Sequence, residues 1–283
     1  MGMASDIARK LGKIGVWRRW SDLDTALAAE LDRLGYGTLW VGGSPDGDLA
    51  IISDLLAATE RIMLATGIVN MWKDDAATVA ASFHRIDAAY PGRFLLGVGI
   101  GHPEATKEYR SPYATMVSYL DELAAAGVRK DQMVLAALGP RALRLAADRT
   151  AGAHPYLTTP EHTKQARQLM GPDALLAPEQ KVVVDDDPER GRAVARPGVE
   201  TPYLHLSNYL NSLRRLGWSD ADLADGGSDR LVDALAVHGD ATTVAAGLTA
   251  HLDAGADHVA VQLLGDDPVT GFRALAELLP VSR

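Results

Sequence analysis

The chain has 283 residues, 47% of them hydrophobic, which is enough for a large core. Its net charge of −9 argues against a general nucleic-acid-binding protein, and the lack of cysteine excludes disulfides, thiolate catalysis and zinc–thiolate sites. No apolar run approaches the ~20 residues of a membrane span, and the opening MGMASDIARK has no apolar signal core. We therefore expect a cytoplasmic protein that binds neither nucleic acid nor membranes.

Short apolar runs alternate with amphipathic segments along the whole chain. Eight runs predict strands, and each is followed by helical sequence, which predicts an α/β fold, a single (β/α)8 TIM barrel. A doubly wound open sheet is the weaker alternative, because no dinucleotide-binding fingerprint is present. The predicted strands are 13–17, 38–42, 62–70, 94–100, 133–138, 153–157, 181–184 and 258–264, and the predicted helices are 21–34, 49–58, 76–90, 113–126, 141–148, 161–170, 188–216, 242–254 and 270–279.

One stretch, approximately residues 196–228, breaks this alternation. Gly198, Pro202 and Gly217 interrupt its helical pattern, and DGGSD closes it. We interpret it as a helical insertion before the last βα unit, so that residues 1–283 form one barrel domain.

The active site of such a barrel lies on the loops that follow the strands. The first three strands end in VWRRW, LWVGGSPDGD and NMWKDD, which place Trp17, Trp20, Trp40 and Trp72 near this rim. Aromatic residues grouped there favour a pocket for a flat ligand, although each tryptophan alone is also explained by core packing.

The fourth strand ends in GVGIGH. The glycine spacing is GxGxG, not the GxGxxG of dinucleotide sites, and a loop follows instead of a helix. Gly97, Gly99 and Gly101 either open space for a ring or form a tightly packed layer. His102 closes the motif, and His154 holds a similar place later; each is either an acid–base group or an ordinary hydrogen-bonded histidine.

Two helix starts after neighbouring strands suggest an anion site. Gly139 and Pro140 open one helix, and Thr158 and Thr159 precede the next. Free N–H groups at a helix start favour a phosphate, although Thr and Pro are also ordinary helix starters. The acidic run 185–187 precedes Pro188 and suits helix capping better than metal binding, so we expect no metal site.

Several motifs resemble those of one known family, the bacterial luciferase-like flavin and deazaflavin oxidoreductases. The similarity is greatest to the actinobacterial branch that is expected to use coenzyme F420, and it covers nearly the whole chain. The pattern at 91–101 is fairly specific to the superfamily but does not choose between F420 and FMN. The motifs are LATGIVN, YPGRFLLGVGIGH, AALGPRALRLAADRTAGAHPY, LLAPEQKVVV and HLDAGADHVAVQLL.

The resemblance implies where the cofactor sits. Deazaflavin members carry a bulge with a non-prolyl cis peptide at the end of the third strand, which backs the ring and here falls between Gly67 and Ile68. Val69 and Asn70 would then contact the ring, with Asn70 bonding its polar edge. The family's phosphate site maps onto the two helix starts. The implied cofactor-binding residues are Gly43, Gly67, Ile68, Val69, Asn70, Leu138, Gly139, Pro140, Thr158 and Thr159.

The implied reaction is hydride transfer between F420 and a small organic substrate. Sugar-phosphate dehydrogenases of the family carry Asp-His after the second strand and Glu after the fourth. Here these positions read Gly43-Ser44 and His102, which argues against a sugar-phosphate substrate and leaves Ser44 and His102 as the catalytic candidates.

Two other functions remain open on the sequence. One is an FMN-dependent luciferase-type monooxygenase, which needs oxygen and a reductase partner. The other is a barrel that binds the deazaflavin without catalysis. By analogy with the family we also expect a homodimer.

Overall fold

The computed structural model describes residues 3–101 and 111–281. Apolar, β-branched runs form its strands. Every residue of the second strand is buried, as expected where helices cover one face of a strand and the barrel interior covers the other. The strands are β1 Ile14–Arg19, β2 Thr38–Gly42, β3 Met63–Gly67, β4 Val69–Asn70, β5 Phe94–Gly99, β6 Met133–Leu135, β7 Gly152–Ala153, β8 Leu175–Leu176, β9 Glu179–Val184, β10 Ala236–Gly239 and β11 Val259–Leu263.

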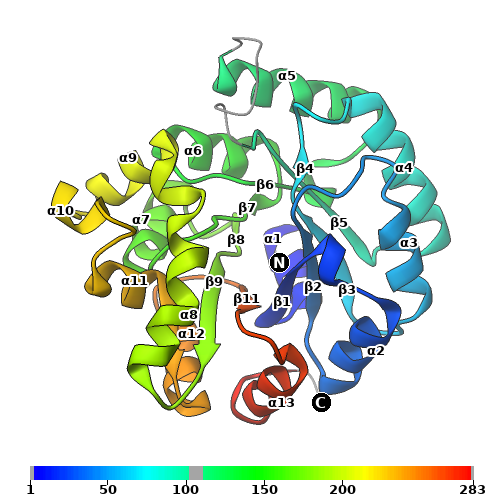
Figure 1. Cartoon of the computed structure of the whole chain (residues 1–283). Helices are drawn as coiled ribbons and strands as arrows, with labels where there is room; N and C mark the ends of the chain where they lie inside the picture. The colour runs from blue at the N-terminus through cyan, green and yellow to red at the C-terminus, as the bar shows by residue number, and fades with distance from the viewer. Residues whose placement is uncertain (1–2, 102–110, 282–283) are drawn as a thin grey trace.

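Helices surround these strands (Figure 1). Most begin at a residue suited to capping: Asp24 accepts a hydrogen bond from the N–H of Leu27, and Asp240 accepts one from Thr243. The α-helices are α1 Met3–Leu11, α2 Thr25–Leu34, α3 Ala50–Ala57, α4 Ala76–Ala89, α5 Pro112–Ala125, α6 Pro140–Arg149, α7 Pro160–Met170, α8 Pro188–Glu200, α9 Ser207–Arg215, α10 Asp220–Leu223, α11 Asp229–Leu235, α12 Ala241–Asp253 and α13 Pro268–Leu278.

The strands pair in parallel in the order β10-β9-β11-β1-β2-β3-β5-β6-β7-β8, and β4 pairs with β5. The outermost strands of this order are β10 and β8, and β8 continues directly into β9 within one chain segment, residues 175–184. On one side the N–H of Ala177 donates to the carbonyl of Ala153, and on the other the N–H of Ala260 donates to Pro178. The sheet therefore curls into a barrel, which confirms the predicted fold class.

Helix α1, which the sequence analysis did not predict, covers one end of the barrel. Ile7 and Leu11 are buried in a cluster with residues of the barrel interior, such as Met63 and Leu95. The carbonyl of Leu11 also accepts a hydrogen bond from the hydroxyl of Thr38 at 2.8 Å. In Figure 1 this helix lies near the centre of the view, among the strands. The opposite end, where the strands finish, is the end that carries the predicted site.

The barrel interior holds one of the tryptophans predicted at the rim. Trp40 is fully buried, its ring stacks on His154 with centroids 4.0 Å apart, and its Nε1 donates to His258 Nε2 at 2.9 Å. The expectation for Trp40 is therefore wrong, because its side chain points inward from the middle of β2. Gly97 serves close strand packing, since a Cβ there would lie 1.8 Å from the carbonyl oxygen of Thr66.

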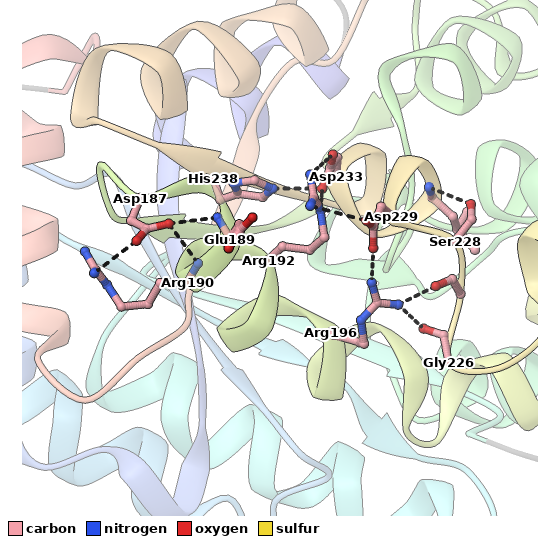
Figure 2. A network of polar contacts seen from close by, with 12 residues as sticks. Asp187, Glu189, Arg190, Arg192, Arg196, Gly226, Ser228, Asp229, Asp233 and His238 are labelled. Carbon is pink, nitrogen blue, oxygen red and sulfur yellow. Dashed lines mark hydrogen bonds and ion pairs between the residues drawn. The ribbon is translucent and has the colours of Figure 1, made fainter.

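The irregular helical segment lies between β9 and β10, so that two βα units follow it, not one as expected, because β10 was not predicted. Helix α8 continues to Glu200, beyond the expected start at 196, and the irregular part follows it. Figure 2 shows how α8 is attached: Arg192 pairs with Asp233 at 2.7 Å, and Asp233 also bonds His238 of β10 at 2.8 Å. Arg196 reaches Asp229 at the start of α11.

The acidic run before α8 has a structural role. Asp187, in the acidic run, caps α8 by accepting hydrogen bonds from the N–H groups of Glu189 and Arg190, as the capping interpretation predicted (Figure 2).

Among the described residues, none of the helices has the length and apolar character needed to cross a bilayer.

Candidate active site

The bulge between β3 and β4 lies at the open end of the barrel. The cis peptide bond predicted between Gly67 and Ile68 is present. The carbonyl oxygen of Gly67 accepts a hydrogen bond from Trp17 Nε1 at 3.2 Å. A Cβ at position 67 would lie 2.8 Å from that nitrogen and 3.2 Å from Nε2 of His154. Glycine is therefore required here by the surrounding side chains.

The residues after Gly67 face in different directions. Ile68 is partly exposed and lies over Gly99, where an added Cβ would come within 3.0 Å of its side chain. Val69 is fully buried and packs in the core between strands and helices, so its side chain offers no surface to a ligand. Asn70 is partly exposed, and its Oδ1 accepts the N–H of Trp72 at 2.9 Å. Of the three, Ile68 and Asn70 present side chains to the open end.

The turn after β2 carries Gly43 and Ser44. Both have positive φ angles, 76° and 55°, and the carbonyl of Ser44 accepts a hydrogen bond from Lys73 Nζ at 3.1 Å. A Cβ at Gly43 would lie 3.5 Å from the ring of Trp20, which is exposed at this rim. The other catalytic candidate, His102, lies outside the described residues.

The two predicted helix starts lie next to each other. His162 Nε2, in the first turn of α7, bonds the carbonyl of Leu138 at 2.9 Å, which joins the two loops. Gly139 is the N-cap of α6, with Pro140 at the first helical position, and Thr159 caps α7 by accepting from the N–H of His162. The predicted pair of helix starts is thus present as a local structure.

The neighbouring threonine has a different environment. Thr158 is 2% exposed, and its Oγ1 has no hydrogen-bond partner within the described part of the chain. Buried hydroxyl groups almost always have a partner, so this oxygen is a polar group that a ligand would satisfy.

An arginine from the insertion also reaches this place. Arg215, at the end of α9, brings Nη2 to 3.6 Å from where a Cβ of Gly139 would lie. Its neighbour Arg214 pairs with Asp220 at 2.8 Å, whereas Arg215 forms no ion pair with the described residues. Sequence reasoning missed Arg215 because nothing in an irregular insertion indicates which loop its helices cover.

A cavity of about 240 Å³ opens on the other side of Trp17, at the carboxyl ends of β1, β9 and β11. Its polar wall is built on a buried ion pair: Lys181 Nζ lies 3.2 Å from Glu179 Oε1, and both side chains are at most 1% exposed. Burial lowers the pKa of Lys181 and raises that of Glu179, and the attraction between the two opposes both shifts.

Two tyrosines and a glutamine complete this wall. Lys181 Nζ lies 3.9 Å from the ring centroid of Tyr156 and donates to Gln262 Oε1 at 3.1 Å. The hydroxyl of Tyr156 donates to the same oxygen at 2.7 Å, and the hydroxyl of Tyr203 donates to that of Tyr156 at 3.2 Å. Burial raises the pKa of Tyr156 and Tyr203, so both hydroxyl groups keep their protons at neutral pH.

The chain is similar to known proteins in part of its sequence and in nearly all of its fold. Residues 22–129 match the model of the luciferase-like monooxygenase family. A segment of 89 residues is 37% identical to 4-hydroxyprotoasukamycin monooxygenase from Streptomyces nodosus subsp. asukaensis; it covers 29% of this chain and about a quarter (24%) of that protein.

Solved structures of low sequence identity share the fold. An F420-dependent secondary alcohol dehydrogenase in complex with an F420-acetone adduct has a TM-score of 0.74 at 16% identity. The coenzyme F420-dependent tetrahydromethanopterin reductase from Methanopyrus kandleri has 0.75 at 15%. The oxygenating constituent of 3,6-diketocamphane monooxygenase from Pseudomonas putida, in complex with FMN, has 0.70 at 14%. Each likeness covers 95% of this chain and 98% of the other.

The family match lies over the strands that carry the bulge and the glycine-rich end of β5, and the barrel continues beyond it in the same form as in these structures. The chain therefore resembles the luciferase-like family in residues 22–129 and shares the barrel fold of these structures over nearly its whole length.

Proposed function

We propose that the protein is an oxidoreductase that binds coenzyme F420 at the open end of the barrel and transfers a hydride between it and a small organic substrate. Two of the solved structures that share the fold are F420-dependent proteins, and the sequence motifs resemble the F420-using branch of the family, which supports this choice of cofactor. The observation that carries the proposal is the buried, unpartnered hydroxyl of Thr158 beside two helix starts.

The described residues fit a flat cofactor whose side arm carries a phosphate group. The Thr158 hydroxyl, the N–H groups at the start of α6 and the guanidinium of Arg215 are all donors, which is the set that a phosphate requires. At the bulge, the partly exposed Ile68 and Asn70 leave a surface for a ring, whereas Trp17 and His154 fill the space where a side chain of residue 67 would lie. When bound, F420 supplies the hydride chemistry.

The chain's own residues position the reactants and hold a proton. Trp17 forms a wall between the bulge and the cavity and shields the space from water. Hydride transfer to a carbonyl group also needs a proton. The hydroxyl of Tyr203 lines the cavity and keeps its proton, and contact with Tyr156 holds it in place. We propose this pair, alongside Ser44 and His102, as a source of the proton.

The experiment is a titration of the purified protein with F420 and with FMN, followed by fluorescence and thermal stability. We expect F420 to bind, and Arg215→Gln to weaken its binding about tenfold, because a hydrogen bond to a charged group contributes about 1.5–3 kcal/mol. Arg214→Gln is the matched control, since Arg214 already pairs with Asp220. Equal weakening by both variants, or no binding of F420, would contradict the proposal.

A second candidate is an FMN-dependent monooxygenase. The matching family model and the curated relative both carry the name monooxygenase, and one structural relative holds FMN. Tight binding of FMN without binding of F420 in the same titration would favour this function. Binding of F420 with no turnover across a panel of alcohols, ketones and enones would instead favour a non-catalytic barrel.

A further inference from the structure

We propose that the cavity at the ends of β1, β9 and β11 is the substrate pocket and that it binds a small molecule through one carboxylate group, held by Arg18 and Arg19. That the bound molecule is a substrate rests on the proposed function, whereas the binding itself rests on the cavity.

The cavity adjoins the place assigned to the cofactor ring. Trp17 lines the cavity with one part of its ring, and its Nε1 bonds the carbonyl of Gly67. One side chain therefore separates the bulge from the cavity. With about 240 Å³, the cavity lies below the usual size of pockets for drug-sized ligands, which suits a molecule of few heavy atoms.

The charges around the cavity leave one positive charge in excess. Three cations line it, namely Arg18, Arg19 and Lys181. Lys181 is balanced by Glu179 beneath it. Asp22 also lines the cavity and attracts Arg18, but within the described residues no carboxylate lies within 4.0 Å of either arginine. A ligand with a single negative charge would neutralise the cavity.

The hydrogen-bonding groups point to the same ligand. Nε of Arg18 is buried and has no partner in the described part of the chain, and its Nη1 reaches only the carbonyl of Leu263, at 3.4 Å. A buried N–H without an acceptor is costly, and a carboxylate oxygen would satisfy it. Gln262 receives two hydrogen bonds on Oε1, which fixes its amide and leaves Nε2 as a donor at the cavity wall. The wall therefore offers donors, and a carboxylate supplies acceptors.

The test measures binding without catalysis. Butyrate is titrated into the protein without cofactor and followed by calorimetry and thermal stability, with the neutral butyramide and inorganic phosphate as parallel probes. We expect butyrate to bind more tightly than butyramide, and Arg18→Gln and Arg19→Gln each to weaken it about tenfold, the equivalent of one charged hydrogen bond. Arg144→Gln, on the exposed face of α6, makes the same charge change and should bind butyrate normally.

Arg19 is exposed, so its variant keeps the test valid if Arg18→Gln fails to fold. Equal affinity for butyrate and butyramide, or butyrate binding that neither arginine variant weakens, would overturn the proposal. Phosphate binding that depends on Arg18 and Arg19 while butyrate does not bind would also overturn it, because the pocket would then take a different anion. A parallel F420 titration separates the two proposals. Binding of butyrate without binding of F420 contradicts the proposed cofactor, and binding of F420 without binding of butyrate contradicts the proposed carboxylate pocket.

Discussion

Trp17 and Gly67 are joined by a hydrogen bond of 3.2 Å from the indole nitrogen to the carbonyl oxygen, although the two residues are 50 positions apart in the chain. The bond fastens the bulge after β3 to the end of β1. The same indole nitrogen lies 2.8 Å from where a side chain at position 67 would begin.

Replacing Gly67 by alanine should therefore displace Trp17 or the bulge and lower the affinity for F420 by about tenfold, which corresponds to about 1.4 kcal/mol of binding free energy. Fluorescence titration of the cofactor measures the effect. Gly217→Ala is the control, because Gly217 has a positive φ of 91° with no atom within 4 Å of an added Cβ. It should cost about 1 kcal/mol of stability and leave binding intact. Normal affinity in Gly67→Ala would argue against the bulge as part of the cofactor site.

Thr158 and Thr159 should respond in opposite ways to replacement by valine. The Thr158 hydroxyl has no described partner, so Thr158→Val should keep or raise the free energy of unfolding and weaken cofactor binding about tenfold. Thr159 caps α7, so Thr159→Val should destabilise the protein by about 1 kcal/mol. Urea unfolding and cofactor titration of both variants check this. A large loss of stability in Thr158→Val would show that its hydroxyl already has a structural role.

The buried pair of Lys181 and Glu179 should behave as one unit. In Lys181→Met the Glu179 carboxylate keeps only the hydrogen bond from the N–H of Leu157, at 2.9 Å. The variant should lower the free energy of unfolding by about 3–5 kcal/mol, because a buried charge is left without its partner. Adding Glu179→Gln to that variant should recover much of the loss, because no charge then remains buried. Urea unfolding of the two single variants and the double variant forms a thermodynamic cycle. Strictly additive losses would contradict the coupling.

Three buried histidines should make stability fall in mild acid. Burial lowers the pKa of His154 and His258 to about 4 and that of His251 to about 3, from a usual value of 6.5. Below pH 6.5 the unfolded chain takes up protons that the folded chain excludes until about pH 4. Stability is therefore full above pH 6.5 and is lost on lowering the pH from 6.5 towards 4, by about 1.4 kcal/mol per pH unit for each histidine.

Urea unfolding at several values between pH 7 and pH 5 measures this slope. His258→Gln keeps a group able to accept from Trp40 and donate to the carbonyl of Gly12, but it does not titrate. The variant should therefore reduce the dependence of the unfolding free energy on pH by about 1.4 kcal/mol per pH unit, the contribution of one histidine. A stability that is constant or rises as the pH falls would show that these histidines are charged in the folded protein.

The sequence was sufficient for the barrel because its strands are apolar runs with little periodicity, which is typical of parallel strands buried on both faces. It was not sufficient for elements that depend on tertiary contact. β10, Ala236–Gly239, has only four residues and takes its strand form from pairing with β9. The sixth predicted strand, 153–157, is a regular strand only at its first residue, Ala153. Pro155 has no N–H to donate, although its carbonyl still accepts the N–H of Glu179 at 2.8 Å.

The candidate site was predicted where a local motif carries it. Gly139 and Thr159 have a local reason for their residue type, a helix start, whereas Gly67 was singled out through the family resemblance and is required by the distant side chains of Trp17 and His154. Residues whose place depends on tertiary contact were not predicted. Arg215 reaches the helix starts from the insertion. Lys181 is buried, although a lysine in a strand usually indicates a solvent-facing position. The difference between Trp17 and Trp40 was also hidden, since both sit in apolar runs and only the barrel geometry separates the rim from the interior.

Helix α1 has a consequence for the order of events during turnover. With Ile7 and Leu11 seated against the barrel interior, the amino end of the barrel is closed like the base of a cup. A cofactor and a substrate bound inside the barrel must then both enter through its open end. The one that is bound deeper therefore binds first and dissociates last. A barrel closed at one end therefore favours an ordered binding mechanism, which product-inhibition kinetics would reveal.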